Sequence, residues 1–424
     1  MISKRLWRPE PLQQPRHIVI AGGGMVGVSL ALMLGHELPS DIRITLVESF
    51  ALPEDTGPPA YHPSFDARST ALSYSSCAIY EQMGVWPDLA QWVCPIATVH
   101  VSNRGRFGST LLSAQDYGWD ALGYVVENAW LGRALLYALR QQERVELINP
   151  ANVAAATPMG ESVVLSIEGD DNDTLTADLL VVADGADSSL RKALGVGTSE
   201  KPYGQSALIA NIALGKSHAG CAFERFTDEG PLALLPLVGV PDAKERSALV
   251  WTLPPERAAQ LMDCSPTDFL QALQSRFGYR LGRLQRVGER FQYPLTLLEA
   301  HEQVRQGIVV MGNAAHALHP VAGQGFNLAL RDVAQLSACI GQGIEQQRSP
   351  GDLSVLKQYQ ELQADDQRRT IAFSDKVPGL FMHPDPVLSV ARDLALAGLD
   401  ISPPLKRAFV RHAAGIAAMA SPNA

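Results

Sequence analysis

The feature that most constrains this chain is a glycine-rich turn close to its start. An apolar run, His17–Ala21, leads into Gly22-Gly-Gly24-Met-Val-Gly27 and then into a second apolar segment. The run before the glycines has the length and composition of a buried strand, and the segment after them is typical of a helix. A further apolar run, Ile42–Val47, ends at the acidic residue Glu48. The spacing predicts the strand–turn–helix–strand unit that opens a doubly wound parallel sheet.

Each glycine of this turn has a physical purpose. Gly22 permits the tight turn, Gly24 lets a pyrophosphate approach the main chain, and Gly27 allows the helix to pack closely on the strand. The helix N-terminus faces the phosphates, and Glu48 is expected to hydrogen-bond the ribose of an adenosine. The alternative is a glycine-rich turn without a ligand, but strand, helix, second strand and acid all occur in register. The turn therefore predicts dinucleotide binding.

Two later segments indicate which dinucleotide binds. They are Asp178-Leu-Leu-Val-Val-Ala-Asp184-Gly185-Ala-Asp-Ser188-Ser-Leu-Arg191, and the run from Gly312-Asn313 through Pro320 and Gly323-Gln324-Gly325 to Asn327. With the opening turn, and in the same order, they resemble the three fingerprints of the para-hydroxybenzoate hydroxylase family of flavoprotein monooxygenases. The resemblance spans most of residues 17–345. It implies FAD as the cofactor and NAD(P)H as a co-substrate that docks transiently.

The resemblance also assigns roles to residues. The loop expected along the isoalloxazine ring supplies the candidate catalytic residues, namely Pro320, Gly323, Gln324 and Gly325. The helix that follows points its N-terminus at the ring edge where negative charge collects on reduction. The expected FAD-binding residues are Gly22, Gly24, Gly27, Glu48, Arg68, Asp184, Gly185, Gly312, Asn313, Gly325 and Asn327. Asn313 departs from the aspartate that is common in the family, but its side-chain oxygen can still accept a hydrogen bond from a ribityl hydroxyl.

Three of these predictions have ordinary alternatives. Arg68 resembles the arginine at the mouth of the family's site, although an arginine after a loop can equally make a surface ion pair. Arg191 is expected to fix its segment through a structural ion pair. His316 and His319 have the spacing of metal ligands, but they fall inside the flavin motif and no carboxylate or cysteine set completes a site. The sequence therefore predicts no metal site.

Composition limits the remaining classes of function. The formal net charge of −9 argues against a nucleic-acid-binding protein, which would show a basic face. The five cysteines are scattered without a C-x-x-C pair, a pattern that suits a reducing cytoplasm. The first fifteen residues lack the apolar core of a signal peptide, and no stretch reaches the roughly 18 apolar residues of a membrane span. The expected location is cytoplasmic.

The separated motifs predict an α/β (α+β) fold, in which a Rossmann-like FAD domain of the glutathione-reductase type carries an inserted mixed-sheet substrate domain. The FAD domain is assigned to residues 1–75, 124–200 and 304–347, and the substrate domain to residues 76–123 and 201–303. Residues 348–424 form a C-terminal helical segment, with breaks expected at Pro378, Pro384–Pro386 and Pro403–Pro404.

Three further features of the sequence narrow the range of candidate substrates. They are Thr98-Val-His100-Val-Ser-Asn-Arg104-Gly, the run from Ala222-Phe-Glu224-Arg225-Phe226 through Gly230-Pro231 to Pro236-Leu, and the Gly312-Asn313 variant. The combination is similar to the 2-polyprenyl-6-methoxyphenol hydroxylases of ubiquinone biosynthesis. This implies that NAD(P)H reduces the flavin and that O₂ adds to form a C4a-hydroperoxide, which attacks the phenol. No residue is assigned to the phenol proton.

Several alternatives stay open at this point. The enzyme could hydroxylate another position of the same ring or another phenol, or act as a prenyl-chain reductase. A tryptophan-type halogenase is disfavoured because W-x-W-x-I-P is absent. From another class, the chain could be a non-catalytic FAD-containing scaffold of a biosynthetic complex.

A lipophilic phenol also implies a meeting with lipid or with a delivering partner. Val387–Leu399 is apolar, and Lys406, Arg407 and Arg411 follow it beside further apolar residues. Such a pattern favours a peripheral site on the inner membrane surface or within a ubiquinone-pathway enzyme complex. The alternative is a helical layer packed on the FAD domain.

Overall fold

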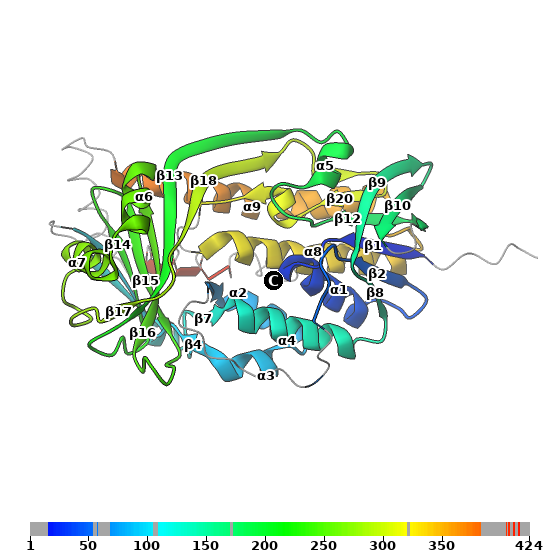
Figure 1. Ribbon diagram of the computed structural model, residues 1–424. Coiled ribbons are helices and arrows are strands. Elements are labelled where there is room, and N and C mark those ends of the chain that lie inside the picture. Colours follow the sequence, from blue (N-terminus) through cyan, green and yellow to red (C-terminus); the bar gives the residue numbers. More distant parts are fainter. Residues whose placement is uncertain are drawn as a thin grey trace, which may run out of the picture.

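The computed structural model describes residues 16–53, 57, 68–104, 109–169, 173–319 and 323–382, and the positions 404, 406–407, 410–411 and 414–415. The described chain has two sheet-based parts lying side by side, with a large sheet in one and the N-terminal β-α-β unit in the other (Figure 1).

A six-stranded sheet forms the centre of the N-terminal part. Its strand order is β19 (Val304–Arg305), β20 (Ile308–Val310), β12 (Leu179–Val182), β1 (His17–Ala21), β2 (Arg43–Val47) and β8 (Val145–Ile148). The five strands from β20 to β8 are parallel, and only β19 is antiparallel to its neighbour. Apolar side chains fill both faces of β1 and β12, as expected for parallel strands covered on both sides.

Helices cover one face of this sheet and a small antiparallel sheet covers the other. The helices are α1 (Met25–Glu37), α4 (Asn128–Gln141), α8 (Gln324–Glu345) and α9 (Leu353–Met382), which share one apolar core with the sheet. The opposite face packs on a sheet of β9 (Ala151–Met159), β10 (Ser162–Gly169) and β11 (Thr174–Ala177), in which β10 pairs with both of the others. The short helix α5 (Ser189–Ala193) follows β12.

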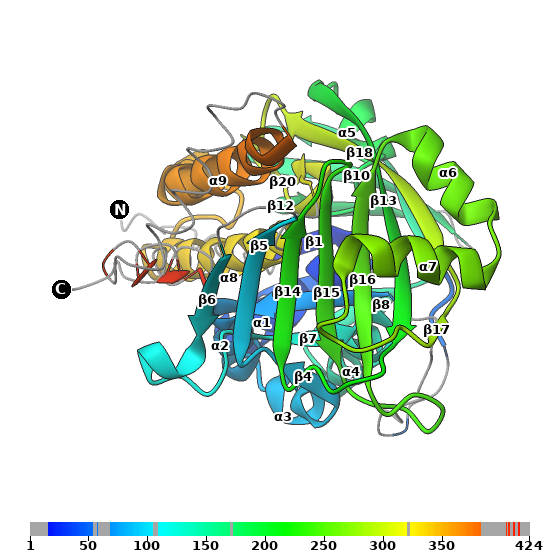
Figure 2. The ribbon, with the colours of Figure 1, turned by 90° about the vertical axis from the view of Figure 1, so that its left-hand side faces the viewer.

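The other part is built on a nine-stranded, mostly antiparallel sheet. Its order is β21 (His316–Ala317), β18 (Phe291–Ala300), β13 (Thr198–Ala213), β16 (Arg246–Leu253), β15 (Pro231–Leu237), β14 (Cys221–Phe226), β5 (Thr98–Asn103) and β6 (Ser109–Ser113), and β17 (Arg286–Val287) also pairs with β13. Helices α6 (Pro255–Asp263) and α7 (Pro266–Phe277) lie across one face of this sheet (Figure 2). Trp251, Phe269 and Phe277 are buried in the core between them.

The two parts are joined by long strands and by a third sheet. Strands β13 and β18 pair over much of their length and extend from the nine-stranded sheet toward α5 (Figure 1). A three-stranded sheet, β3 (Ser69–Ser73), β7 (Gly123–Glu127) and β4 (Val93–Pro95), lies with α2 (Tyr74–Gln82) and α3 (Trp86–Leu89) beside the large sheet.

The fold class predicted from the sequence is confirmed. The proposed domain boundaries stay a prediction. The helix break at Pro378 is wrong, because α9 continues through it to Met382. Proline removes one main-chain donor, and this position near the end of a long helix leaves the preceding turns intact. Pro384–Pro386, Pro403 and Val387–Leu399 lie outside the described residues, among which no helix could span a membrane. Pro404 is described and is helical.

Candidate active site

The opening turn combines two glycines that the fold requires with one that it does not. Gly22 has φ +109°, and a Cβ there would lie 2.5 Å from the main-chain oxygen of Ala183. A Cβ on Gly27 would lie 1.9 Å from the oxygen of Gly22. A Cβ on Gly24, in contrast, would meet no described heavy atom within 4 Å. Gly24 therefore leaves space beside the N-terminus of α1, where a phosphate-bearing ligand can approach the main chain.

Glu48 lies at the carboxyl end of β2 and braces this turn. The Gly23 N–H donates to its Oε2 at 2.6 Å, and the Phe50 N–H donates to its Oε1 at 2.8 Å. The side chain is buried among these partners. Glu48 thus holds the turn and occupies the position beside it that the sequence predicts for a ribose contact.

Asp184 and Gly185 follow β12 at the same sheet edge. Asp184 Oδ1 is buried and has no hydrogen-bond partner among the described residues, and Oδ2 accepts only a long bond of 3.4 Å from Leu190 N–H. A buried acceptor without a partner is costly unless a ligand satisfies it. This orphaned oxygen is what a bound dinucleotide with hydroxyl groups would complete.

Arg191 connects two of the motifs, but through different partners from those predicted. Its Nη1 donates to the main-chain oxygens of Ala186 at 3.0 Å and Ala314 at 2.9 Å, and the side chain is buried. The expected ion pair is wrong, because the described partners of this guanidinium are carbonyl groups. A guanidinium has several donors, and loop carbonyls that form no ladder need them.

The third motif places a helix N-terminus at the site. Gly312 and Gly323 both have φ +61°, in the left-handed region that glycine adopts without strain. Gly323 caps α8, whose first turn has no acidic side chain, so the positive end of the helix is not neutralised by this helix's own residues. Residues 320–322, and with them the candidate catalytic Pro320, lie outside the described residues.

Asn327 shapes this loop through its side chain. Its Nδ2 donates to the oxygens of Ala71 at 2.9 Å and Gly323 at 2.7 Å, and its Oδ1 accepts from the Ser73 N–H at 2.8 Å and from the Ser76 hydroxyl at 2.7 Å. Both amide donors are occupied by protein partners. Asn327 therefore positions the start of α8 against β3 and α2, whereas Asn313 is exposed toward the cavity described below.

Arg68 and the two histidines have other surroundings. Arg68 is exposed, its Nη1 donates to the Tyr293 hydroxyl at 3.3 Å, and its role at the site stays a prediction. The buried His316 lies 3.2 Å from Asp332. His319 is packed edge-on against Tyr203, and burial lowers its pKa to about 4. The described residues contain no group of three or more metal-ligating side chains.

A cavity of about 670 Å³ connects these motifs with the large sheet. From the motifs it is lined by Gly24, Gly185, Gly312, Asn313, Gly323, Gln324, Gly325 and Asn327. Gly22, Gly27, Glu48, Arg68 and Asp184 do not line it. The opposite wall is the inner face of β5, β6 and β13–β16, with mostly apolar side chains.

One acidic residue, Glu224 on β14, interrupts this apolar wall. Glu224 is half-buried, and it lines the cavity. Burial raises the pKa of Glu224 to about 7. Glu224 belongs to one of the sequence stretches that resemble the ubiquinone-pathway hydroxylases, but no role is predicted for it from the sequence. The sequence signal that could have indicated a role is the alternation of side chains along the strand, which places Glu224 on the same face as the apolar residues Ala222 and Phe226.

These features fit FAD. The space beside Gly24 suits a pyrophosphate, and the unpaired oxygen of Asp184 suits a hydroxyl group. The positive N-terminus of α8 suits an electron-accepting ring. Bound FAD would take reducing equivalents from NAD(P)H and activate O₂ for transfer of one oxygen atom. The chain's own residues would hold the cofactor, and the apolar wall would limit the access of water to the reaction.

Comparisons with known proteins agree with this geometry. The model of the FAD binding domain family matches residues 16–374. Ubiquinone hydroxylase UbiL of Rhodospirillum rubrum is 33% identical over 398 residues, which cover 94% of this chain and 89% of that protein. The 3-demethoxyubiquinol 3-hydroxylase of Escherichia coli is 29% identical, with 95% and 99% covered. The crystal structure of p-nitrophenol 4-monooxygenase PnpA from Pseudomonas putida DLL-E4 has a TM-score of 0.75 at 17% identity, with 96% and 99% covered, and shares the fold. The chain belongs to the FAD binding domain family and is an FAD-dependent hydroxylase.

Proposed function

We propose that this hydroxylase acts on a polyprenylated phenol, of the 2-polyprenyl-6-methoxyphenol type, in ubiquinone biosynthesis. The observation that carries the proposal is the cavity, which begins at Gly323–Gly325 and continues along an apolar sheet face. The relatives named above are ubiquinone-pathway hydroxylases by name, which supports the same substrate class.

The composition of the wall suits a prenyl chain. Val99, Val101, Leu112, Leu235 and Val250 contribute branched apolar side chains to it. Each methylene moved from water onto such a surface contributes about 0.8 kcal/mol. A chain of several isoprene units would therefore supply most of the binding free energy, and the few polar groups would orient the ring.

We also propose the division of labour among the predicted site residues. Gly22, Gly24, Gly27, Glu48, Asp184 and Gly185 would hold the adenosine and pyrophosphate half of FAD. Gly312, Asn313 and Gly323–Gly325 would hold the ribityl chain and the isoalloxazine ring. The positive N-terminus of α8 would favour the reduced, negatively charged flavin.

The substrate assignment can be tested in a strain that lacks the gene. The phenolic intermediate that accumulates should carry a polyprenyl chain, and its mass and fragmentation should identify the ring position that is left without a hydroxyl group. The purified protein should convert that intermediate with O₂ and NAD(P)H consumed in equal amounts. A deletion strain with a normal ubiquinone content would contradict the proposal. Bound flavin that NAD(P)H does not reduce would instead favour the scaffold alternative.

The proposed substrate also bears on location. A polyprenyl phenol partitions into bilayers, so we propose that the enzyme works at the inner membrane surface or receives its substrate from a pathway partner. Flotation of the full-length protein with anionic liposomes, and co-purification with other enzymes of the pathway, are the measurements. The outcome that contradicts the proposal is a protein that neither floats nor co-purifies with a partner.

A further inference from the structure

We propose that the carboxylate of Glu224 is the base that accepts the proton of the substrate's phenol hydroxyl. The inference rests on the proposed function, because it requires a phenol in the cavity. It follows from the position of Glu224, its surroundings and the chemistry of the reaction.

Glu224 lies in the middle of a row of residues that crosses the sheet. Strand register aligns Thr110 of β6, Val101 of β5, Glu224 of β14, Ala233 of β15, Val250 of β16 and Ile209 of β13. All six line the cavity, so the row points to the substrate side of the sheet. An acid near its centre would contact a substrate ring held between the sheet and Gly323–Gly325.

The residues next to this row on β5 and β14 point to the opposite face of the sheet. His100, one residue before Val101, contacts Arg280 next to α7, on the other face of the sheet. Arg225, one residue after Glu224, alternates to that same face. The charged groups near β14 therefore lie behind the sheet, and Glu224 alone of this strand's ionisable residues faces the cavity.

Within the part of the chain that the structure describes, nothing neutralises this carboxyl. Its nearest cross-strand neighbours, Val101 and Ala233, are apolar, and burial is the one influence on its pKa. Proteins pair buried charges or use them. A carboxyl without a described partner in a ligand cavity is accordingly a candidate for contact with substrate.

His319 is the other ionisable side chain among the described residues that line the cavity. Burial lowers its pKa to about 4, and its ring packs against Tyr203. An imidazole with so low a pKa is a weaker base than a carboxylate whose pKa is about 7. Of the two, Glu224 is the one suited to take a phenol proton.

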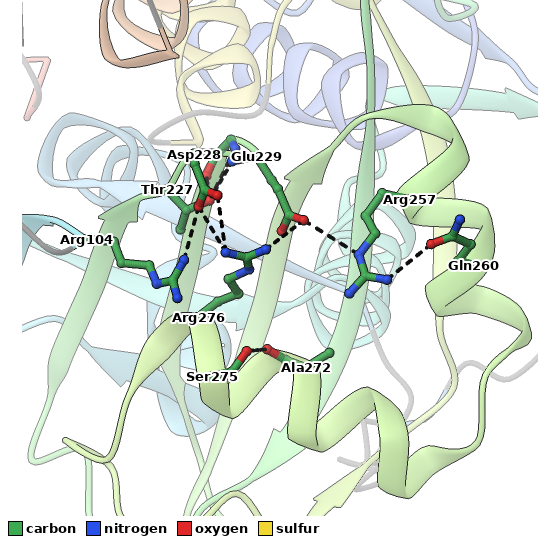
Figure 3. A network of polar contacts seen from close by, with 10 residues as sticks. Arg104, Thr227, Asp228, Glu229, Arg257, Gln260, Ala272, Ser275 and Arg276 are labelled. Carbon is green, nitrogen blue, oxygen red and sulfur yellow. Dashed lines mark hydrogen bonds and ion pairs between the residues drawn. The ribbon is translucent and has the colours of Figure 1, made fainter. Parts of the chain in front are cut away.

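A network of polar contacts fixes the end of the strand that carries Glu224. Thr227 and Gly230 close the turn from β14 to β15 through the Thr227 hydroxyl, which donates to the Gly230 oxygen at 2.7 Å. Arg276 of α7 pairs with Asp228 at 3.1 Å and with Glu229 at 2.9 Å, on the turn itself (Figure 3). The register of Glu224 is therefore set by contacts outside the cavity.

The phenol O–H transfers its proton to Glu224, which increases electron density at the ring carbons ortho and para to the oxygen. One oxygen atom bonds to such a carbon, and the other leaves as water with the two electrons that NAD(P)H supplied. The carbon loses its hydrogen as a proton, and Glu224 returns its own proton to the ring oxygen. In sum, phenol, O₂, NAD(P)H and H⁺ give the dihydroxylated ring, NAD(P)⁺ and water.

The test uses the FAD-loaded protein and two synthetic probes, 2-farnesyl-6-methoxyphenol and the same phenol with a ring fluorine that makes it more acidic. In the wild type, product formation should rise with pH through an apparent pKa near 7. In Glu224→Gln this rise with pH should be absent, and the rate of product formation at neutral pH should fall about 100-fold or more. The fluorinated phenol, which needs less help to ionise, should recover a large part of the loss. Reduction of the flavin by NAD(P)H should not change, and more H₂O₂ should form.

Two further variants separate a base from a structural role. Glu224→Asp keeps a carboxylate, so its rate of product formation should be lower but should still rise with pH. Glu200→Gln removes an exposed carboxylate of the same sheet and should behave as wild type. The inference is overturned if Glu224→Gln hydroxylates at the wild-type rate, or if its deficit is the same for both phenols. A wild type that hydroxylates no phenol would overturn the proposed function itself, which is a different result.

Discussion

Arg246 at the start of β16 donates to Glu127 at the end of β7 over 2.9 Å, and both side chains are almost completely buried. This ion pair ties the three-stranded sheet to the nine-stranded sheet next to the cavity. Removing one partner leaves a buried charge without its counter-ion, and Glu127→Ala should lower the free energy of unfolding by about 3–5 kcal/mol. Denaturant unfolding measures the loss. Glu146→Ala, which breaks the exposed pair with Arg43, is the control and should cost under about 1 kcal/mol.

The empty space beside Gly24 predicts a variant that folds without its cofactor. A Cβ on Gly24 meets no described atom within 4 Å, so Gly24→Asp should fold, but its carboxylate would occupy the place of the pyrophosphate. The purified protein should be colourless, with the circular dichroism of the wild type. Gly132→Asp introduces the same side chain into similarly open space on α4 and should stay yellow. A yellow Gly24→Asp protein would show that the pyrophosphate lies elsewhere.

Asn313 is predicted to accept a hydrogen bond from a ribityl hydroxyl. Asn313→Asp keeps the acceptor and should keep FAD, whereas Asn313→Leu leaves a ligand hydroxyl unpaired and should weaken binding by about 1–3 kcal/mol. Flavin released on dilution, followed by fluorescence, gives the affinity. Asn152→Leu, at an exposed position of β9, is the control. Equal affinities of the two Asn313 variants would refute the role.

His319 predicts a component of acid sensitivity. Burial lowers its folded-state pKa to about 4, below the unfolded value near 6.5, so the unfolded chain binds the proton first as the pH falls. Its contribution to stability is present above about pH 6.5 and is lost as the pH falls toward 4. Between pH 7 and pH 5 the loss should be about 2 kcal/mol, and His319→Gln should remove it. His36→Gln, on the surface, should keep the wild-type pH dependence.

Much of the fold was predictable because its signals are local. The apolar run His17–Ala21 and the bounds of α7 follow from periodicity, proline and the Ser265 cap. The separated motifs indicated an inserted domain because only a return of the chain to one sheet edge could bring them together.

The role of Glu224 depended on pairing at long range. The sequence shows that Glu224 alternates with Arg225, but it does not show which of the two faces the cavity. That choice is made by β5, more than a hundred residues earlier, and by the packing of α7. Asn327 is similar, since its partners Ala71, Ser73 and Ser76 belong to segments that no local pattern connects with α8.

The bonds from Arg191 to Ala186 and Ala314 have a consequence for biosynthesis. The segments proposed to hold the cofactor come from the beginning, middle and last third of the chain, and this guanidinium joins two of them. A ribosome must release the polypeptide beyond α8 before these pieces can meet. The nascent chain therefore cannot capture flavin during most of its synthesis. Cofactor loading becomes a late event, which can begin only after the third motif has left the ribosome.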